Sequence, residues 1–280
     1  MKEIAYGTIV EAVAELCIKA NYFLSDDVKV ALDEATKSEL SPLGKEILQD
    51  LYSNVEIASR EQVPICQDTG TAVVFVEIGQ NVFINGGLLR DAINAGVKKG
   101  YSEGYLRKSI VSNPLQRENT GDNTPAIIHT ELVEGDSLKI TVAPKGGGSE
   151  NMSALTMLTP SAGIQGVKSF VLDTIKKAGP NPCPPIIVGL GIGGNFELAP
   201  LLAKKALLRE IGQYNQDPIA AKLEKELFSE INCLGIGPEG FGGSTTTLAV
   251  NIELYPCHIA SLPVAVNINC HVARHQSVII

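Results

Sequence analysis

Apolar residues in the first 60 positions recur at the spacing of amphipathic helices. The first such set repeats at intervals of three and four residues and comprises Ile9, Val10, Val13, Leu16 and Cys17. Ser25-Asp26-Asp27 is a candidate cap for a second helix, and Ser41-Pro42 places a capping residue before a proline at the start of a third. The pattern predicts a helical N-terminal layer over residues 1–60.

From residue 64 onward, short β-type apolar runs alternate with helical segments. Strands are expected at residues 73–77, 82–84, 132–143, 185–190, 246–255 and 264–268. Helices are expected at residues 86–100, 152–178, 200–211 and 218–231. This mixture predicts an α/β (mixed α+β) body over residues 61–280. No internal repeat or Pro/Ser-rich linker divides it, so a single domain over residues 1–280 is expected.

Composition narrows the class of protein. The 280 residues are 44% hydrophobic, which provides ample core for one large domain or two small ones. A net charge of −8, no basic cluster, no Trp and only 5% aromatic residues argue against nucleic acid or an anionic membrane as partners. The N-terminus lacks the apolar core of a signal peptide, and no apolar run reaches the length of a membrane span. A cytoplasmic protein is expected.

Three glycine-rich segments interrupt the body, at residues 145–148, 189–194 and 235–243. The second follows an apolar strand but has the spacing G-x-G-x-G-G, not the G-x-G-x-x-G of dinucleotide sites. The acidic residue expected about 20 positions later would be Glu210, within a predicted helix. The pattern therefore favours a glycine turn that lets the main chain approach a neighbour closely.

Six cysteines are dispersed along the chain, and no C-x-x-C pair marks a zinc site. Cys17 lies on the apolar face of a predicted helix, which is typical of a structural thiol. The other five lie beside turns: Cys66, Cys183, Cys233, Cys257 and Cys270. Prolines on both sides of Cys183 favour a stiff, extended backbone there. Spacing alone leaves scattered buried thiols and metal ligands as open alternatives.

Other polar residues carry weaker signals. Cys66-Gln67-Asp68 places a thiol near a carboxylate in a turn, which suits a site with a positive centre between them. The four histidines, His129, His258, His271 and His275, are each as consistent with structural roles as with acid–base chemistry. The polar run at residues 119–125 suits a hairpin or a cap as well as a site.

Together, seven ordered motifs resemble the α subunit of the iron–sulfur-dependent class I fumarate hydratase and L-tartrate dehydratase family. The resemblance covers about residues 5–275. The motifs are CQDTGTA at 66, LRKS at 106, NTGDNTPA at 119, PKGGGSEN at 144, NPCPPIIVGLGIGG at 181, GPEGFGGSTTTLAV at 237 and YPCHIASLPVAVNINCHVARH at 255.

This resemblance implies a [4Fe-4S] cluster held by Cys66, Cys183 and Cys270, with glycine-rich loops around it. Three thiolates leave one iron open to act as a Lewis acid toward a substrate hydroxyl. The positions implied to contact substrate are Gln67, Asp68, Arg107, Gly147 and His258. Of these, Asp68 and His258 are the implied catalytic residues, Asp68 as the base or its orienting group and His258 as a partner of the hydroxyl or the leaving water.

The activity implied is reversible hydration of fumarate to L-malate, with L-tartrate dehydration to oxaloacetate and water as the alternative. A non-catalytic iron–sulfur sensor or scaffold is the alternative from another class.

The substrate implied is a small dicarboxylate, which needs further cations near its two charges. Lys145, Arg117 and Arg274 are candidates. Single-chain family members supply more cations from a C-terminal region. Because this sequence ends at Ile280, we expect a separate β subunit that completes the site, in an assembly of two α and two β subunits.

Overall fold

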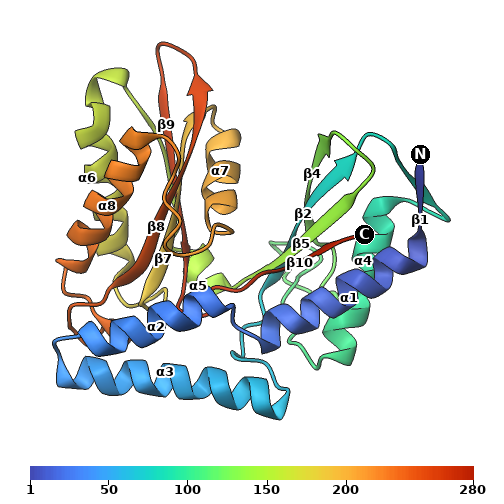
Figure 1. Cartoon of the computed structure of the whole chain (residues 1–280), viewed down its shortest axis with the longest axis horizontal. Coiled ribbons are helices and arrows are strands. Elements are labelled where there is room, and N and C mark those ends of the chain that lie inside the picture. Colours follow the sequence, from blue (N-terminus) through green and yellow to red (C-terminus); the bar gives the residue numbers. More distant parts are fainter. The chain divides into compact units, whose positions relative to one another are not determined.

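The computed structural model describes all 280 residues and divides them into two compact units (Figure 1). Unit 1 comprises residues 1–24, 54–147 and 274–280, and unit 2 comprises residues 25–53 and 148–273. The predicted N-terminal layer is therefore shared between the units, and a single catalytic domain over the whole chain stays a prediction. None of the helices combines the length and apolar character needed to cross a membrane.

Unit 1 contains a four-stranded mixed sheet. Its order is β10 (Gln276–Ile279), β5 (Leu138–Lys145), β2 (Thr71–Gly79) and β4 (Ile127–Val133). The central strand β2 is parallel to β4 and antiparallel to β5. β2 begins immediately after the Cys66–Gly70 segment. The sheet therefore holds the C-terminal end of that segment in place.

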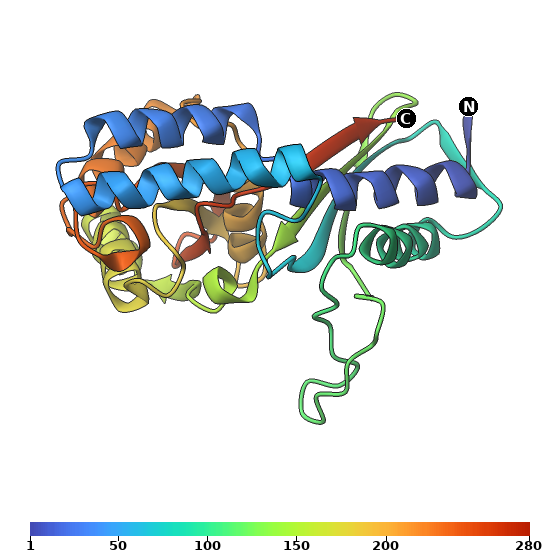
Figure 2. The same ribbon diagram turned by 90° about the horizontal axis from the view of Figure 1, so that it is seen from below.

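Two helices, α1 (Tyr6–Tyr22) and α4 (Leu89–Glu103), pack together in unit 1. Their apolar faces join the inner face of the sheet in one core, to which Val13, Ile93 and Ile140 contribute without measurable exposure. β1 (Lys2–Ala5) pairs in parallel with β3 (Val82–Asn85) at the edge of this unit. Figure 2 shows the segment between α4 and β4 extending away from the sheet.

Unit 2 contains a second four-stranded sheet. Its order is β6 (Ala154–Leu158), β9 (Leu262–Asn269), β7 (Ile186–Gly194) and β8 (Thr247–Cys257). β7 is parallel to β8 and antiparallel to β9. Helices α6 (Gly163–Ala178) and α8 (Pro218–Asn232) cover one face, and α7 (Leu198–Ala206) packs on the other (Figure 1). The short helices are α5 (Gly147–Glu150), η1 (Pro160–Ala162) and η2 (Pro238–Gly240).

The remaining helices are α2 (Asp26–Ser38) and α3 (Pro42–Glu61), and the boundary between the units falls within α3. The buried side chain of Glu39, between these helices, accepts hydrogen bonds from Leu40, Ser41, Ser244 and Thr245. This carboxylate therefore ties the α2–α3 connection to the loop before β8.

The predicted mixed α+β fold is confirmed, including all three N-terminal helices. Ser41 caps α3 by accepting the Gly44 N–H at 3.2 Å, whereas Ser25 makes no capping bond. The helix predicted over residues 152–178 is wrong in its first part, which forms β6 and pairs antiparallel with β9. The terminal strands β1 and β10 were not expected, because each is only four residues long and pairs with a strand distant in sequence.

The glycine turn predicted after residue 188 is also wrong, since Gly189–Gly194 continue β7. The close approach expected there is confirmed. A Cβ on Gly189 would lie 2.2 Å from the Ala203 carbonyl oxygen, and one on Gly191 would lie 2.0 Å from that of Ala199. These two positions thus allow α7 to pack directly on the strand.

Candidate functional site

The turn at residues 66–70 in unit 1 carries three of the predicted site residues. The Asp68 carboxylate accepts the N–H of Gly70 at 3.0 Å through Oδ1 and that of Gly147 at 2.8 Å through Oδ2. The Asp68 N–H in turn lies 3.4 Å from Cys66 Sγ. Both carboxylate oxygens and the adjacent sulfur are thus oriented by main-chain N–H groups.

Arg107 is joined to this turn through its main chain. The Thr69 hydroxyl donates to the Arg107 carbonyl at 3.0 Å, while the Arg107 side chain is exposed and makes no hydrogen bond or ion pair. Gln67 is also exposed, and its Oε1 lies 3.4 Å from Cys66 Sγ. Unit 1 therefore brings together Cys66, Gln67, Asp68, Arg107 and Gly147, which are the predicted site residues that it contains.

Three buried side chains hold successive carbonyl groups of the same turn. Arg274 Nη2 donates to the Asp68 carbonyl, Tyr101 Oη donates to those of Thr69 (2.7 Å) and Gly70 (3.0 Å), and Asn123 Nδ2 donates to that of Gly70 (3.1 Å). Burial raises the pKa of the Tyr101 hydroxyl well above its ordinary value, so it remains a donor. We call Tyr101, Asn123 and Arg274 the carbonyl clamp.

Unit 2 brings two of the predicted cluster ligands into neighbouring loops. Cys183 precedes β7 and Cys270 follows β9, and the N–H of His271 donates to the Cys183 carbonyl at 3.3 Å. His271 Nδ1 lies 3.1 Å from that carbonyl oxygen and 3.1 Å from Glu239 Oε1. The extended backbone predicted at Cys183 is wrong, because its φ of +54° is left-handed.

His258 lies at the opposite end of the same sheet. Ile187 pairs with Asn269 near Cys183 and Cys270, whereas Gly194 pairs with Cys257 next to His258. Seven residues of β7 at about 3.3 Å each separate these ends by about 23 Å. Within this unit His258 is therefore remote from the two cysteines, and its Nδ1 accepts the Ala260 N–H at 3.1 Å.

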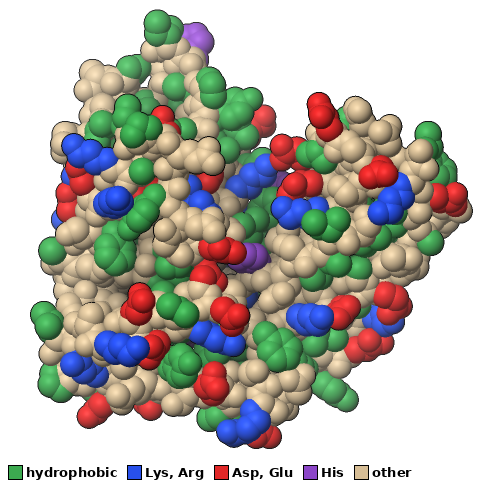
Figure 3. All heavy atoms as spheres, in the orientation of Figure 1, with side chains coloured by type: hydrophobic (Ala, Val, Ile, Leu, Met, Phe, Trp, Pro, Cys, Tyr) green, Lys and Arg blue, Asp and Glu red, His purple; other side chains and the backbone are tan.

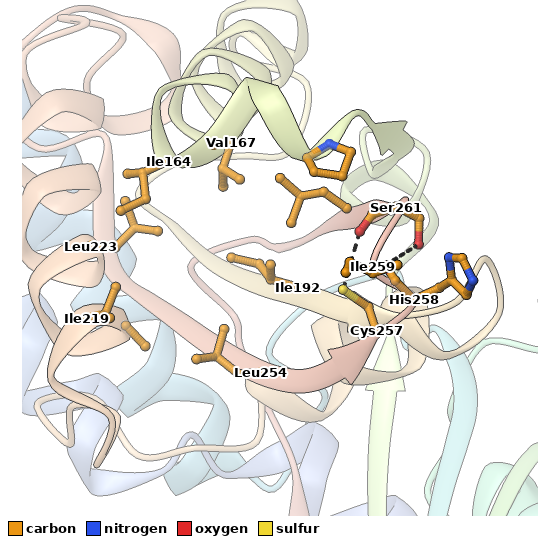
Figure 4. Close-up of a pocket in the computed structure, with 14 residues that line it drawn as sticks. Ile164, Val167, Ile192, Ile219, Leu223, Leu254, Cys257, His258, Ile259 and Ser261 are labelled. Atoms are coloured by element: carbon orange, nitrogen blue, oxygen red, sulfur yellow. Dashed lines mark hydrogen bonds between the residues drawn. The ribbon is translucent and has the colours of Figure 1, made fainter.

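An apolar cavity of about 420 Å³ lies beside His258, between α6, α8 and the ends of β7–β9. Figure 4 shows Ile164, Val167 and Leu223 lining it while the His258 ring projects away from them. Figure 3 shows hydrophobic side chains on the surface around the β8–β9 turn, where Ile259 is 91% exposed. An apolar lining would not offset the desolvation of a dicarboxylate, so this cavity does not suit a ligand of that kind.

Comparison with known proteins defines the family. The sequence model of the fumarate hydratase (Fumerase) family matches residues 10–279. The chain belongs to the fumarate hydratase family. It is 49% identical over 273 residues to the "Putative L(+)-tartrate dehydratase subunit alpha" of Methanocaldococcus jannaschii, with 95% of each chain covered. It is 33% identical over 282 residues to the L(+)-tartrate dehydratase subunit alpha of Escherichia coli O157:H7, covering 100% of this chain and 93% of the relative.

The family match and these names confirm the predicted resemblance and the hydro-lyase enzyme class. Both relatives are named as α subunits, which implies a β partner for such chains. The assignments of Cys66, Cys183, Cys270, Asp68 and His258 stay predictions.

The cysteines differ in their suitability as metal ligands. None of the six is in a disulfide. Cys17 is fully buried, and burial raises the pKa of its thiol to about 12, as suits the predicted structural role. Cys66, Cys183 and Cys270 are at least partly exposed in loops. The structure contains no group of three or more His, Cys, Asp or Glu side chains arranged to hold a metal ion.

Sequence reasoning missed most of the residues that support the site. Tyr101 has the periodic position of a core residue on α4, and Asn123 lies in the polar run that suited an ordinary hairpin. Glu239, beside His271, lies in the short helix η2 within the glycine-rich segment 235–243. Arg274 was expected only as a further cation. No local pattern marks a residue whose role is to bind a carbonyl group far away in the sequence.

Proposed function

We propose that this chain is the α subunit of a [4Fe-4S]-dependent hydro-lyase that hydrates fumarate reversibly to L-malate. The observation that supports this best is the turn at residues 66–70. There the Asp68 carboxylate accepts two main-chain N–H groups and lies near the partly exposed Cys66. Thr69, in the same turn, binds the main chain of Arg107, whose side chain is exposed.

The donor chemistry of the three predicted ligands fits an iron–sulfur cluster. Cys66, Cys183 and Cys270 would hold it, because thiolates are the usual ligands of such clusters. The N–H of Asp68 directed at Cys66 Sγ is the kind of hydrogen bond that tunes a cluster thiolate. When bound, a cluster with three protein ligands supplies a Lewis-acidic iron with an open position.

The side chains of unit 1 would bind and orient the substrate. The Arg107 guanidinium, which makes no ion pair in the chain, would hold a substrate carboxylate in bidentate fashion. Gln67 would donate its amide N–H groups to a substrate oxygen. Asp68 would accept a substrate proton on a carboxylate oxygen or orient the group that does, since each oxygen retains a lone pair beyond its N–H bond.

A β subunit would complete the site. A dicarboxylate dianion needs more than one cation, and of the additional candidates, Arg274 is already buried against the Asp68 carbonyl. The names of the relatives as α subunits support a partner chain that brings further cations. We propose a heterotetramer of two α and two β subunits as the active form.

L-tartrate is the second candidate substrate, and the relatives' names favour it. L-tartrate differs from malate by one hydroxyl, so a single polar contact could decide between them. Steady-state assays of the anaerobically reconstituted α and β chains on L-malate, fumarate and L-tartrate, compared by kcat/KM, would identify the substrate.

The cluster assignment has a matched test. Replacing Cys66, Cys183 or Cys270 by serine should reduce bound iron and sulfide together with activity. Cys233→Ser, at an exposed cysteine outside the predicted ligand set, should preserve both. A ligand variant that retains full iron and activity would refute the assignment. Full iron in the wild type with no turnover of any of the three acids would favour a sensor or scaffold.

A further inference from the structure

One residue of the carbonyl clamp, Arg274, carries a charge that the other two do not. Tyr101 and Asn123 are neutral donors that leave no measurable surface exposed, and each binds carbonyl groups of the turn. Arg274 is 5% exposed and holds the Asp68 carbonyl through Nη2, but its Nε and Nη1 atoms have no hydrogen-bond partner.

A buried guanidinium with two unpartnered nitrogens is costly. Removing a charged group such as a guanidinium from water is unfavourable unless a partner offsets the lost hydration. A neutral donor could bind one carbonyl without this penalty, as Tyr101 and Asn123 do. Arg274 therefore brings to this turn a positive charge that binding a carbonyl group does not itself require.

The position of the charge suggests its use. The Arg274 guanidinium contacts the main chain of Asp68. Asp68 carries a carboxylate and lies two positions after Cys66. This contact places a positive charge against the main chain of the turn. Its contact with the carbonyl also fixes the peptide from which the Asp68 side chain projects.

We propose that Arg274 is the positioning residue that holds Asp68 in its reactive orientation. This inference rests on the proposed function, because it assigns Arg274 to the same reaction without contact to substrate. Arg274 keeps the carbonyl of Asp68 in place, and the N–H groups of Gly70 and Gly147 then fix the carboxylate. Without the guanidinium, only Tyr101 and Asn123 of the carbonyl clamp hold the turn, and the Asp68 carboxylate loses its orientation.

The test compares Arg274→Met, which removes the charge, with Arg274→Lys, which retains it. In the full chain, hydrogen–deuterium exchange is followed in peptides that contain the Gly70 and Gly147 N–H groups. We expect exchange there to accelerate about 10-fold or more in Arg274→Met and to remain near the wild-type rate in Arg274→Lys. This readout is independent of cluster content and of turnover.

In the reconstituted enzyme, Arg274→Met should lower kcat by roughly 10- to 100-fold and change KM less than about 3-fold, because misorientation of a reacting group acts on kcat. Arg274→Lys should recover most of the loss. Tyr22→Phe is the matched control, since Tyr22 Oη is also a buried donor to a carbonyl, that of Gly104 at 2.9 Å in unit 1. It should leave both exchange at Gly70 and kcat unchanged.

Unchanged exchange at Gly70 and Gly147 in Arg274→Met would overturn the proposal, as would an unchanged kcat or an equal loss in Arg274→Lys. If Arg274→Met does not fold, Arg274→Leu takes its place with the same expectations. If the wild-type enzyme turns over none of the acids, the proposed function fails. In that case the exchange measurement still decides whether Arg274 holds the turn.

Discussion

Glu39 offers a quantitative test of how unit 2 is held together. Its side chain, in a residue only 1% exposed, accepts N–H groups of Leu40, Ser41, Ser244 and Thr245 at 2.8 Å each, and the Ser244 hydroxyl at 3.0 Å. Burial alone would raise the carboxyl pKa, but the hydrogen bonds outweigh it and lower the pKa from 4.5 to about 2. The difference corresponds to about 3 kcal/mol of folding free energy at neutral pH.

The sign of the pH dependence follows from the lowered pKa. The folded state favours the ionised carboxyl, so the stabilisation is complete above the unfolded pKa near 4.5 and is lost as the pH falls toward 2. Glu39→Gln removes one carboxylate oxygen as an acceptor and should lower the free energy of unfolding by about 3 kcal/mol at pH 7. At pH 3.5 the deficit should shrink to about 2 kcal/mol, because the wild type has itself lost part of the contribution.

Urea denaturation of the full chain at both pH values measures this deficit. Glu46→Gln, at an exposed glutamate on α3, is the matched control and should stay within about 0.5 kcal/mol of the wild type. A deficit below about 1 kcal/mol at pH 7, or one that does not change between pH 7 and pH 3.5, would refute the reasoning.

Two further substitutions test the packing around the strands and the turn. Gly191→Ala should destabilise the chain by about 2 kcal/mol or more in urea denaturation, because its Cβ would lie 2.0 Å from the Ala199 carbonyl oxygen. Gly7→Ala is the control and should be neutral or stabilising, because no atom lies within 4 Å of the added Cβ. Tyr101→Phe should cost about 1–3 kcal/mol, since it leaves the buried carbonyl groups of Thr69 and Gly70 without this donor. An unchanged urea midpoint for Tyr101→Phe would show that those carbonyl groups find other donors.

Much of the fold could be predicted because its long helices show an amphipathic pattern in their own sequence. α2, α3 and α8 each bury one face, and Asp217 caps α8 through the N–H groups of Ile219 and Ala220. β6 could not be predicted in the same way. Its partner β9 lies about 100 residues later, and only that pairing makes residues 154–158 extended.

The same difference between local and distant signals applies to the candidate site. The Cys66–Asp68 turn has an unusual local composition, so the sequence could single it out. Its fixation depends on Gly147 and Arg274, which lie 79 and 206 residues from Asp68. Such partners are determined by tertiary structure, and neither periodicity nor spacing contains that information.

The contact between Arg274 and Asp68 has a consequence for biosynthesis. The ribosome makes the turn that bears Cys66 and Asp68 long before it makes the Arg274 side chain, because 206 positions separate Asp68 from Arg274. A nascent chain, or a fragment cut anywhere before residue 274, would display the thiol and the carboxylate with at most Tyr101 and Asn123 of the carbonyl clamp in place. The turn would therefore gain its charged clamp residue only after the ribosome has added 206 residues beyond Asp68.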